Sequence, residues 1–343
     1  MKSLPNFSPN NKSLLAKHLT EAIFNKLVDK KTKHGFTLID AIKSGIKNID
    51  SGIGVYAGDV ESYSIFKELF EPIIIDYHQI GIESKHKSNL DSSNFKGEHL
   101  DSNGEYIIST RIRVGRNIEN FPLGTIISKE GRNQIEQMVS KTLLSFSDNL
   151  AGKYYPLPKM DKTTEERLVN DHFLFKSGDR FLSAAGLNRD WPEGRGIFHN
   201  NEKTFLVWIN EEDQLRIISM QKGGDIKMVF DRLIKGIKKI EENISFLYDD
   251  YLGYISSCPT NLGTAMRASV HIKLPKLAKN YSLLEKIAND YALQIRGLHG
   301  EHSESKSQIF DISNKRRLGI TEVTCISDLY NGIAAIINAE KSL

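Results

Sequence analysis

Five arginines lie within or at the ends of strand-like runs, where a side chain would be held in a more fixed position than on a flexible loop. They are Arg111, Arg113, Arg216, Arg267 and Arg296. A guanidinium is planar, permanently charged and forked, so several of them fixed on a sheet suit the recognition of several phosphate oxygens. The alternative for each position alone is a solvated sheet face or a structural ion pair. Together the five predict a triphosphate site.

Carboxylates occur at two places that could complement a cation. The triplet Glu211-Glu212-Asp213 follows the apolar run 205–209, and Glu301 lies in a polar loop with two glycines. Surface charge, or an ion pair of Arg216 with Glu211 or Asp213, would explain them without any chemistry. If the fold brings Glu212 and Glu301 together, the pair could hold a cation and accept a proton.

Cys258 has hydroxyl and amide neighbours in Ser256-Ser257-Cys258-Pro259-Thr260-Asn261. Such groups could donate hydrogen bonds to sulfur and favour the thiolate, although a buried and inert cysteine is the simpler explanation. Cys325 falls in a helical apolar stripe, so packing is its expected role. The sequence has neither a GxxxxGK[ST] phosphate loop nor a strand-linked GxGxxG, so a phosphate site would have to be built from arginine side chains.

The composition places few limits on function. The chain has 343 residues, a formal charge of +3, 39% apolar and 26% charged residues. These values are typical of globular proteins and give no support for nucleic-acid binding. No apolar run reaches the length of a membrane span, and the start of the chain lacks an apolar signal core. With only two cysteines, a reducing cytoplasm is the expected compartment.

The order of predicted elements divides the chain into three parts. Residues 1–83 show helical spacing, interrupted by the glycine-rich stretch 50–58; residues 84–105 have the polar composition of a linker; and residues 106–343 alternate strands with long helices. We therefore expect an α+β fold, with a small all-helical N-terminal domain and a larger domain of antiparallel sheet flanked by helices. The predicted strands are 107–114, 205–210, 215–220, 267–274 and 293–296, and the predicted long helices are 130–150, 225–245, 282–291 and 321–340.

Several of these segments, in the same order, resemble the blocks of the phosphagen (guanidino) kinases, and most of all the arginine kinases. The similarity runs from about residue 12 to the C-terminus. The blocks are Ser109-Thr110-Arg111-Ile112-Arg113, Asn210-Glu211-Glu212-Asp213, Cys258-Pro259-Thr260-Asn261-Leu262-Gly263-Thr264, Arg267-Ala268-Ser269-Val270-His271, Gly300-Glu301-His302 and the run 311–317.

This resemblance implies reversible transfer of the γ-phosphate of ATP to L-arginine, which buffers ATP, with Mg²⁺ held by the nucleotide phosphates and water rather than by protein side chains. It implies a catalytic set, a nucleotide set and an acceptor set, and a loop near 297–310 that closes over the site. The catalytic set is Glu212, Glu301, Cys258 and Arg216; the ATP set is Ser109, Arg111, Arg113, His172, Arg216, Arg267, Ser269, His271, Arg296 and His299; the acceptor set is Ser51, Gly52, Ile53, Gly54, Val55, Tyr56, Glu212, Cys258 and Glu301.

Other functions compete with this one. A taurocyamine kinase or another guanidino kinase would keep the chemistry and change the acceptor, and a kinase of protein arginine side chains would change it further. A non-catalytic nucleotide-binding protein is the alternative from a different class, but nucleotide binding alone would not need the cysteine and both acids. The resemblance implies a monomer with ATP, ADP and a small guanidine as partners, and a dimer as the alternative.

Overall fold

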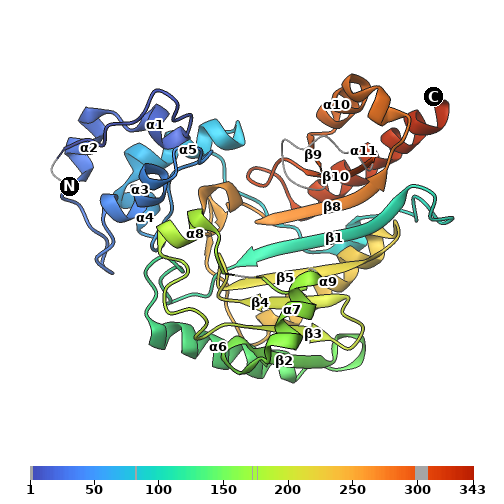
Figure 1. Ribbon diagram of the computed structural model, residues 1–343, viewed down its shortest axis with the longest axis horizontal. Helices are drawn as coiled ribbons and strands as arrows, with labels where there is room; N and C mark the ends of the chain where they lie inside the picture. The colour runs from blue at the N-terminus through green and yellow to red at the C-terminus, as the bar shows by residue number, and fades with distance from the viewer. Residues whose placement is uncertain (1–2, 82, 172, 176, 298–307) are drawn as a thin grey trace.

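The computed structural model describes residues 3–81, 83–171, 173–175, 177–297 and 308–343. Short helices occupy the first part of the chain and form the blue unit at the left of Figure 1, beside the N-terminus. Side-chain caps begin several of them; Thr37, for example, accepts from the backbone of Asp40, whose carboxylate accepts from the backbone of Thr37 in return. The helices are α1 (Leu14–His18), α2 (Glu21–Leu27), α3 (Leu38–Lys47), α4 (Ser62–Ile65) and α5 (Lys67–His78).

Within the described residues, eight strands form one sheet in the order β2-β3-β4-β5-β1-β8-β10-β9. Every neighbouring pair is antiparallel, which confirms the predicted α+β class with an antiparallel sheet. The strands are β1 (Ile107–Arg116), β2 (Gly152–Pro156), β3 (Gly196–Asn200), β4 (Phe205–Ile209), β5 (Leu215–Lys222), β8 (Met266–Lys273), β9 (Leu293–Gly297) and β10 (Ile309–Asn314), with a separate hairpin of β6 (Tyr248–Asp249) and β7 (Gly253–Tyr254).

One face of this sheet carries the main core. Alternate residues such as Ile112, Ile217 and Val270 are fully buried there against the long helices. Helix α9 presents the apolar stripe that its sequence predicts, and α11 packs on the β8–β10 side (Figure 1). The remaining helices are α6 (Lys129–Leu144), α7 (Lys162–Asn170), α8 (Arg180–Ala185), α9 (Ile226–Glu241), α10 (Tyr281–Asp290) and α11 (Glu322–Ser342).

A second apolar cluster joins the helical unit to the sheet-bearing part. It contains Leu15, Phe24 and Phe66 from the first part of the chain, and also Cys258 and Leu318 from the later part. Residues before and after the predicted linker 84–105 therefore pack together in one apolar cluster. Among the described residues, no helix is both long and apolar enough to cross a membrane.

Candidate active site

The strand register gathers the predicted arginines on the sheet face that does not carry the main core. Arg113 lies directly opposite Arg267 on β8, and its other neighbour, on β5, is Ile218. Directly opposite residues in antiparallel strands point to the same side of the sheet. Arg111 is opposite Ser269, and Arg216 is opposite Gly115, so both side chains share this face. Arg111, Arg113, Arg216 and Arg267 therefore project from one face of the sheet, which we call the arginine face.

This face holds more positive charge than the described side chains neutralise. Neither Arg111 nor Arg113 has a carboxylate partner among the described residues. Burial, together with Arg216 and Arg267, lowers the pKa of Arg111 to about 10. The same causes, with Arg111 added, lower the pKa of Arg113 well below its usual range. Buried guanidinium groups that repel one another would be stabilised by a bound polyanion. The triphosphate of ATP is the polyanion that the sequence predicts.

Arg216 is the member of this face that does pair with acids. One of its terminal nitrogens lies 3.0 Å from an Oε2 atom of Glu211 and 3.0 Å from an Oε2 atom of Glu212. The sequence left Glu211 or Asp213 as candidate partners, so the Glu211 pairing is confirmed and the Asp213 one is wrong. Although burial opposes it, the neighbouring carboxylates raise the pKa of Arg216. Arg216 thus connects the arginine face to the acidic turn.

The nucleotide set continues along β8 toward β9. Arg267 donates to Oδ2 of Asp311 at 2.7 Å, and the Nε atom of Arg267 is buried without a partner. Asp311 is opposite His271 on one side and Arg296 on the other, so Arg296 belongs to the same face of the sheet. Ser109 lies opposite His271 in the β1–β8 pairing. The predicted set therefore comes from β5, β1, β8 and β9, with β10 lying between the last two.

Glu212 lies in the tight connection between β4 and β5. Asn210 begins this turn with a left-handed backbone (φ 57°), and its side-chain amide donates to the carbonyls of Arg132 and Gly194. Asparagine tolerates this conformation better than most residues, which explains its place here. Burial raises the pKa of Glu212 to about 7, with Arg216 acting in the opposite direction. The pKa of this carboxyl group is therefore close to neutral pH.

Cys258 is buried and close enough to Glu212 for their charges to interact. Burial, and secondarily Glu212, raise the pKa of the Cys258 thiol to about 12, although the hydroxyl of Thr260 at 3.1 Å acts to lower it. The sequence left a thiolate and a buried, inert cysteine as alternatives, and the raised pKa of Cys258 favours the buried, neutral thiol. Desolvation outweighs one hydrogen bond, and a bound cation would shift the balance back.

The loop predicted to bind the acceptor, Ser51 to Tyr56, packs beside Cys258. The backbone amide of Ala57 donates to the carbonyl of Ser257 at 2.7 Å. Within the loop, Ser51 accepts from the amide of Gly54, while Gly52, Ile53 and Val55 complete it. Gly54 has φ +82°, and a Cβ there would lie 2.6 Å from Leu15, so only glycine fits. Tyr56 is buried; burial, then Cys258 and Glu212, raise its pKa.

Asp213, which the sequence did not single out by itself, joins these pieces. Its carboxylate accepts from Ser256 Oγ at 2.8 and 2.9 Å, from the Ser257 amide at 3.1 Å and from Asn117 Nδ2 at 2.8 Å. The turn that carries Glu212 is thereby tied to the segment that carries Cys258. The sequence carries no local signal for this role, because the partners of Asp213 lie far away along the chain.

A small cavity of about 40 Å³ lies where the predicted groups meet. Arg113, Arg216 and Arg267 line it together with Glu212. Arg317 also lines it, and donates to the Thr260 carbonyl and the Asn261 side chain. Arg317 appeared in a matched block of the sequence but without a predicted role. The cavity therefore brings positive and negative side chains together at one site.

Three predicted residues, His172, His299 and Glu301, lie outside the described residues, as does most of the loop predicted to close. Among the described residues, no group of three or more His, Cys, Asp or Glu side chains could hold a metal ion. The donors that line the small cavity are mainly guanidinium groups, which repel a metal ion and attract phosphate oxygens. This donor set fits a metal that is bound through the nucleotide.

Comparison with known families gives two matches that together cover most of the chain. The model of the N-terminal domain of ATP:guanido phosphotransferases matches residues 9–75, and the model of their C-terminal catalytic domain matches residues 134–343.

Similar curated proteins are arginine kinases. That of Limulus polyphemus is 52% identical over 332 residues, which cover 96% of this chain and 93% of the relative. That of Anthopleura japonica is 53% identical over 339 residues and 98% of this chain. The chain spans about half the length of this second relative, 47% of it.

Solved structures agree in fold. The duplicated taurocyamine kinase of Schistosoma mansoni superposes with a TM-score of 0.91 and 45% identity, over 97% of this chain and 46% of that one. A lombricine kinase superposes with a TM-score of 0.92 and 38% identity, over 99% of this chain and 94% of that one.

Proposed function

Because the chain belongs to the ATP:guanido phosphotransferase family, we propose that it is an arginine kinase that transfers the γ-phosphate of ATP reversibly to L-arginine. The observation that carries the proposal is the small cavity in which Arg113, Arg216 and Arg267 meet Glu212. An anion and a cation can be held there next to each other. The curated arginine kinases with about half of their residues identical support the choice of acceptor.

The arginine face would bind and orient the triphosphate. Arg111 and Arg113 lack carboxylate partners among the described residues, so phosphate oxygens would take those positions. Mg²⁺, when bound through phosphate oxygens and water, would supply further neutralisation of the charge that spreads over the transferred group. Phosphoryl transfer requires alignment and charge stabilisation more than covalent help from the protein, and alignment alone can lower the barrier by ~7–11 kcal/mol.

The acidic turn would bind and orient the acceptor. Glu212 matches the guanidinium charge. Cys258, whose thiol pKa is raised in part by Glu212, is proposed to contact the same acceptor. As a guanidino nitrogen attacks the γ-phosphorus, the N–P bond forms, the bond to the bridging oxygen breaks and ADP leaves. The nitrogen must lose a proton, and Glu212, with its pKa raised to about 7, is placed to accept it. We propose Glu301 as the second carboxylate of this clamp.

The remaining predicted site residues are also divided between the nucleotide and the acceptor. Ser109, Ser269, His271, Arg296, His172 and His299 are proposed on the nucleotide side, and the loop Ser51 to Tyr56 on the acceptor side. Residues 1–83 and 106–343, with 84–105 as linker, are proposed as its domains.

The test is to incubate the purified chain with MgATP and a panel of guanidines, and to measure ADP formation. The panel contains L-arginine, D-arginine, taurocyamine, lombricine, creatine and a peptide arginine. L-Arginine is expected to give the highest kcat/KM. Turnover with none of them would refute the enzymatic proposal, whereas turnover with taurocyamine alone would refute only the choice of acceptor.

A further inference from the structure

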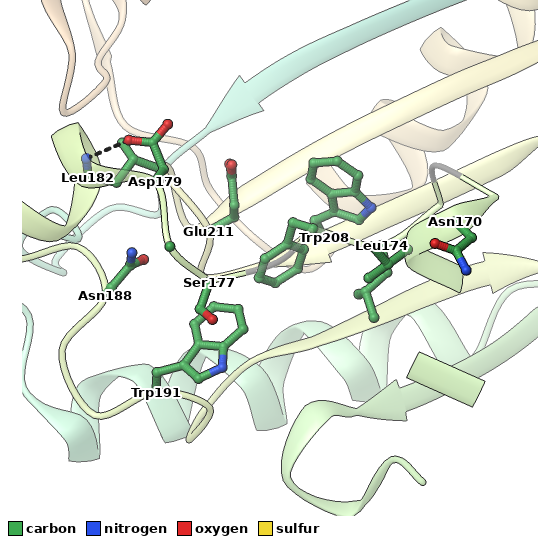
Figure 2. Close-up of a pocket in the computed structure, with 12 residues that line it drawn as sticks. Asn170, Leu174, Ser177, Asp179, Leu182, Asn188, Trp191, Trp208 and Glu211 are labelled. Atoms are coloured by element: carbon green, nitrogen blue, oxygen red, sulfur yellow. Dashed lines mark hydrogen bonds between the residues drawn. The ribbon is translucent and has the colours of Figure 1, made fainter. Parts of the chain in front are cut away.

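A pocket of about 630 Å³ borders the acidic turn and is not part of the assignments made so far. Figure 2 shows that it is lined by aromatic rings and by acids, with Glu211 and Asp179 at one end of the view, Asn170 at the other, and Trp208 between them. Its lining contains no lysine or arginine among the described residues. This composition differs sharply from the arginine face nearby.

Each of the two acids keeps one oxygen available. Asp179 begins helix α8, where its Oδ1 accepts from the amides of Phe181 and Leu182 at 2.8 and 2.9 Å. The Oε2 atom of Glu211 is engaged by Arg216 at 3.0 Å and by the Glu212 amide at 2.8 Å. The second oxygen of each carboxylate has no hydrogen-bond partner in the described part of the chain. Two negative charges with spare acceptors favour a cationic ligand.

The aromatic walls suit the same class of ligand. The Phe175 ring lies 5.3 Å from that of Trp208 and 5.7 Å from that of Trp191. Both indoles already contact guanidinium groups of the protein, Arg216 at 5.5 Å from Trp208 and Arg195 at 5.2 Å from Trp191. Indole faces attract cations, and planar guanidinium groups also stack on them.

The pocket adjoins the acceptor site rather than lying apart from it. Glu211 lines the pocket, and the next residue, Glu212, lines the small cavity with the arginines. The buried phenol of Tyr56 interacts electrostatically with Cys258 and Glu212, and more weakly with Asp179 and Glu211. A cation in the pocket would therefore lie next to the turn that carries Glu212.

We propose that this pocket is an outer binding position for a guanidinium-type organic cation, which holds the acceptor before it passes to Glu212. The inference rests on the proposed function, since it takes the acceptor to be a guanidine. An approach lined with acids would counter the repulsion that the arginine face exerts on such a cation. The triphosphate of ATP fits this lining poorly, because among the described residues it would meet two carboxylates and neither a lysine nor an arginine.

The chain offers a direct reporter, because its two tryptophans, Trp191 and Trp208, both line the pocket. A Trp208→Phe variant leaves Trp191 as the sole source of tryptophan fluorescence, and Glu212→Gln added to it weakens the inner site. This protein is titrated with guanidinium chloride at low millimolar concentration, and separately with L-arginine, without nucleotide. We expect a saturable change in Trp191 fluorescence with both probes.

Asp179→Asn, added to this reporter, is expected to weaken binding roughly two- to fivefold by removing one partly solvated charge. Asparagine caps helices as well as aspartate does, so α8 should remain folded. The matched control is Asp231→Asn, an acid on α9 outside this pocket, which should leave the titration unchanged. In the otherwise unaltered enzyme, Asp179→Asn should lower kcat/KM for the guanidine by the same factor and leave the KM for ATP unchanged.

No saturable response, or a response that Asp179→Asn leaves unchanged, would overturn the inference. So would a response that disappears with Glu212→Gln while circular dichroism shows an intact fold, since it would then belong to the inner site. If the double variant does not fold, Trp208→Phe alone should show two saturable phases, and a single phase would count against the pocket. A response to guanidinium without arginine turnover would remove the proposed acceptor but keep the pocket.

Discussion

The raised pKa of Glu212 has a measurable consequence for the pH dependence of acceptor binding. In the ligand-free protein, burial raises the pKa of this carboxyl from 4.5 to about 7. A shift of this size corresponds to roughly 3 kcal/mol of preference for the protonated form. Only the carboxylate matches a guanidinium, so we expect the affinity for the acceptor to fall as the pH drops below about 7.

The expected decrease in kcat/KM follows from the ionised fraction of Glu212 at each pH. One pH unit below the pKa, about one molecule in ten carries the carboxylate, so kcat/KM for L-arginine should fall roughly tenfold near pH 6 and roughly a hundredfold near pH 5. A bound guanidinium favours the charged carboxylate, so kcat should hold its value to lower pH than kcat/KM does. Initial rates of ADP formation at saturating MgATP, from pH 5 to 8.5, measure both quantities.

Two controls isolate Glu212 from other titrating groups. The guanidinium of arginine does not titrate in this range, and kcat/KM for MgATP at saturating arginine reports any ionisation of the nucleotide. In Glu212→Gln, kcat should be at least about tenfold lower and the limb near pH 7 should vanish. A flat kcat/KM for arginine between pH 6 and 8, or an unchanged limb in Glu212→Gln, would refute the reasoning.

Three further predictions concern other parts of the structure. Thr260→Val removes the hydroxyl that lies 3.1 Å from the Cys258 sulfur, so alkylation by iodoacetamide should slow and its pH midpoint should rise; an unchanged midpoint would contradict this. Arg267→Lys loses the fork that reaches Asp311, and steady-state kinetics should show the KM for ATP rising roughly tenfold with a smaller change for arginine. Gly236→Ala would place a Cβ 2.3 Å from the Phe205 ring, and urea unfolding should show a loss of about 1–3 kcal/mol despite the better helix propensity of alanine.

The sequence predicted best the elements whose periodicity is strong. Period-two alternation located β1 and β8, and the apolar stripe located α9. It did not indicate β3, because Gly196, His199 and Asn200 leave this segment with neither an apolar run nor alternation, although all five of its residues are buried. The equally buried β4 was found because it is a continuous apolar run. The sequence did not predict the short helices α7 and α8, because six to nine residues make too few turns to show a clear helical periodicity of apolar residues.

The sequence predicted that arginine side chains would share a sheet face, but not which residues would lie opposite one another. Alternation showed that Arg111 and Arg113 share a side, yet the register that sets Arg113 opposite Arg267 depends on long-range pairing. The role of Asp213 was also hidden, because its partners, Asn117 and Ser256, lie 96 and 43 residues away along the chain. The resemblance to a family supplied the roles, and the fold supplies the contacts through which they would be carried out.

The apolar cluster shared by the helical unit and the Cys258 segment makes the accessibility of the Cys258 thiol sensitive to the packing of the N-terminal helices. Phe24 and Phe66 pack in the same continuous cluster as Cys258, which is 5% exposed. Damage to any of these early helices would admit water around the sulfur before the sheet itself is disturbed. Chemical labelling of this one atom could therefore report the earliest loosening of the protein under heat or denaturant, well ahead of any spectroscopic sign of unfolding.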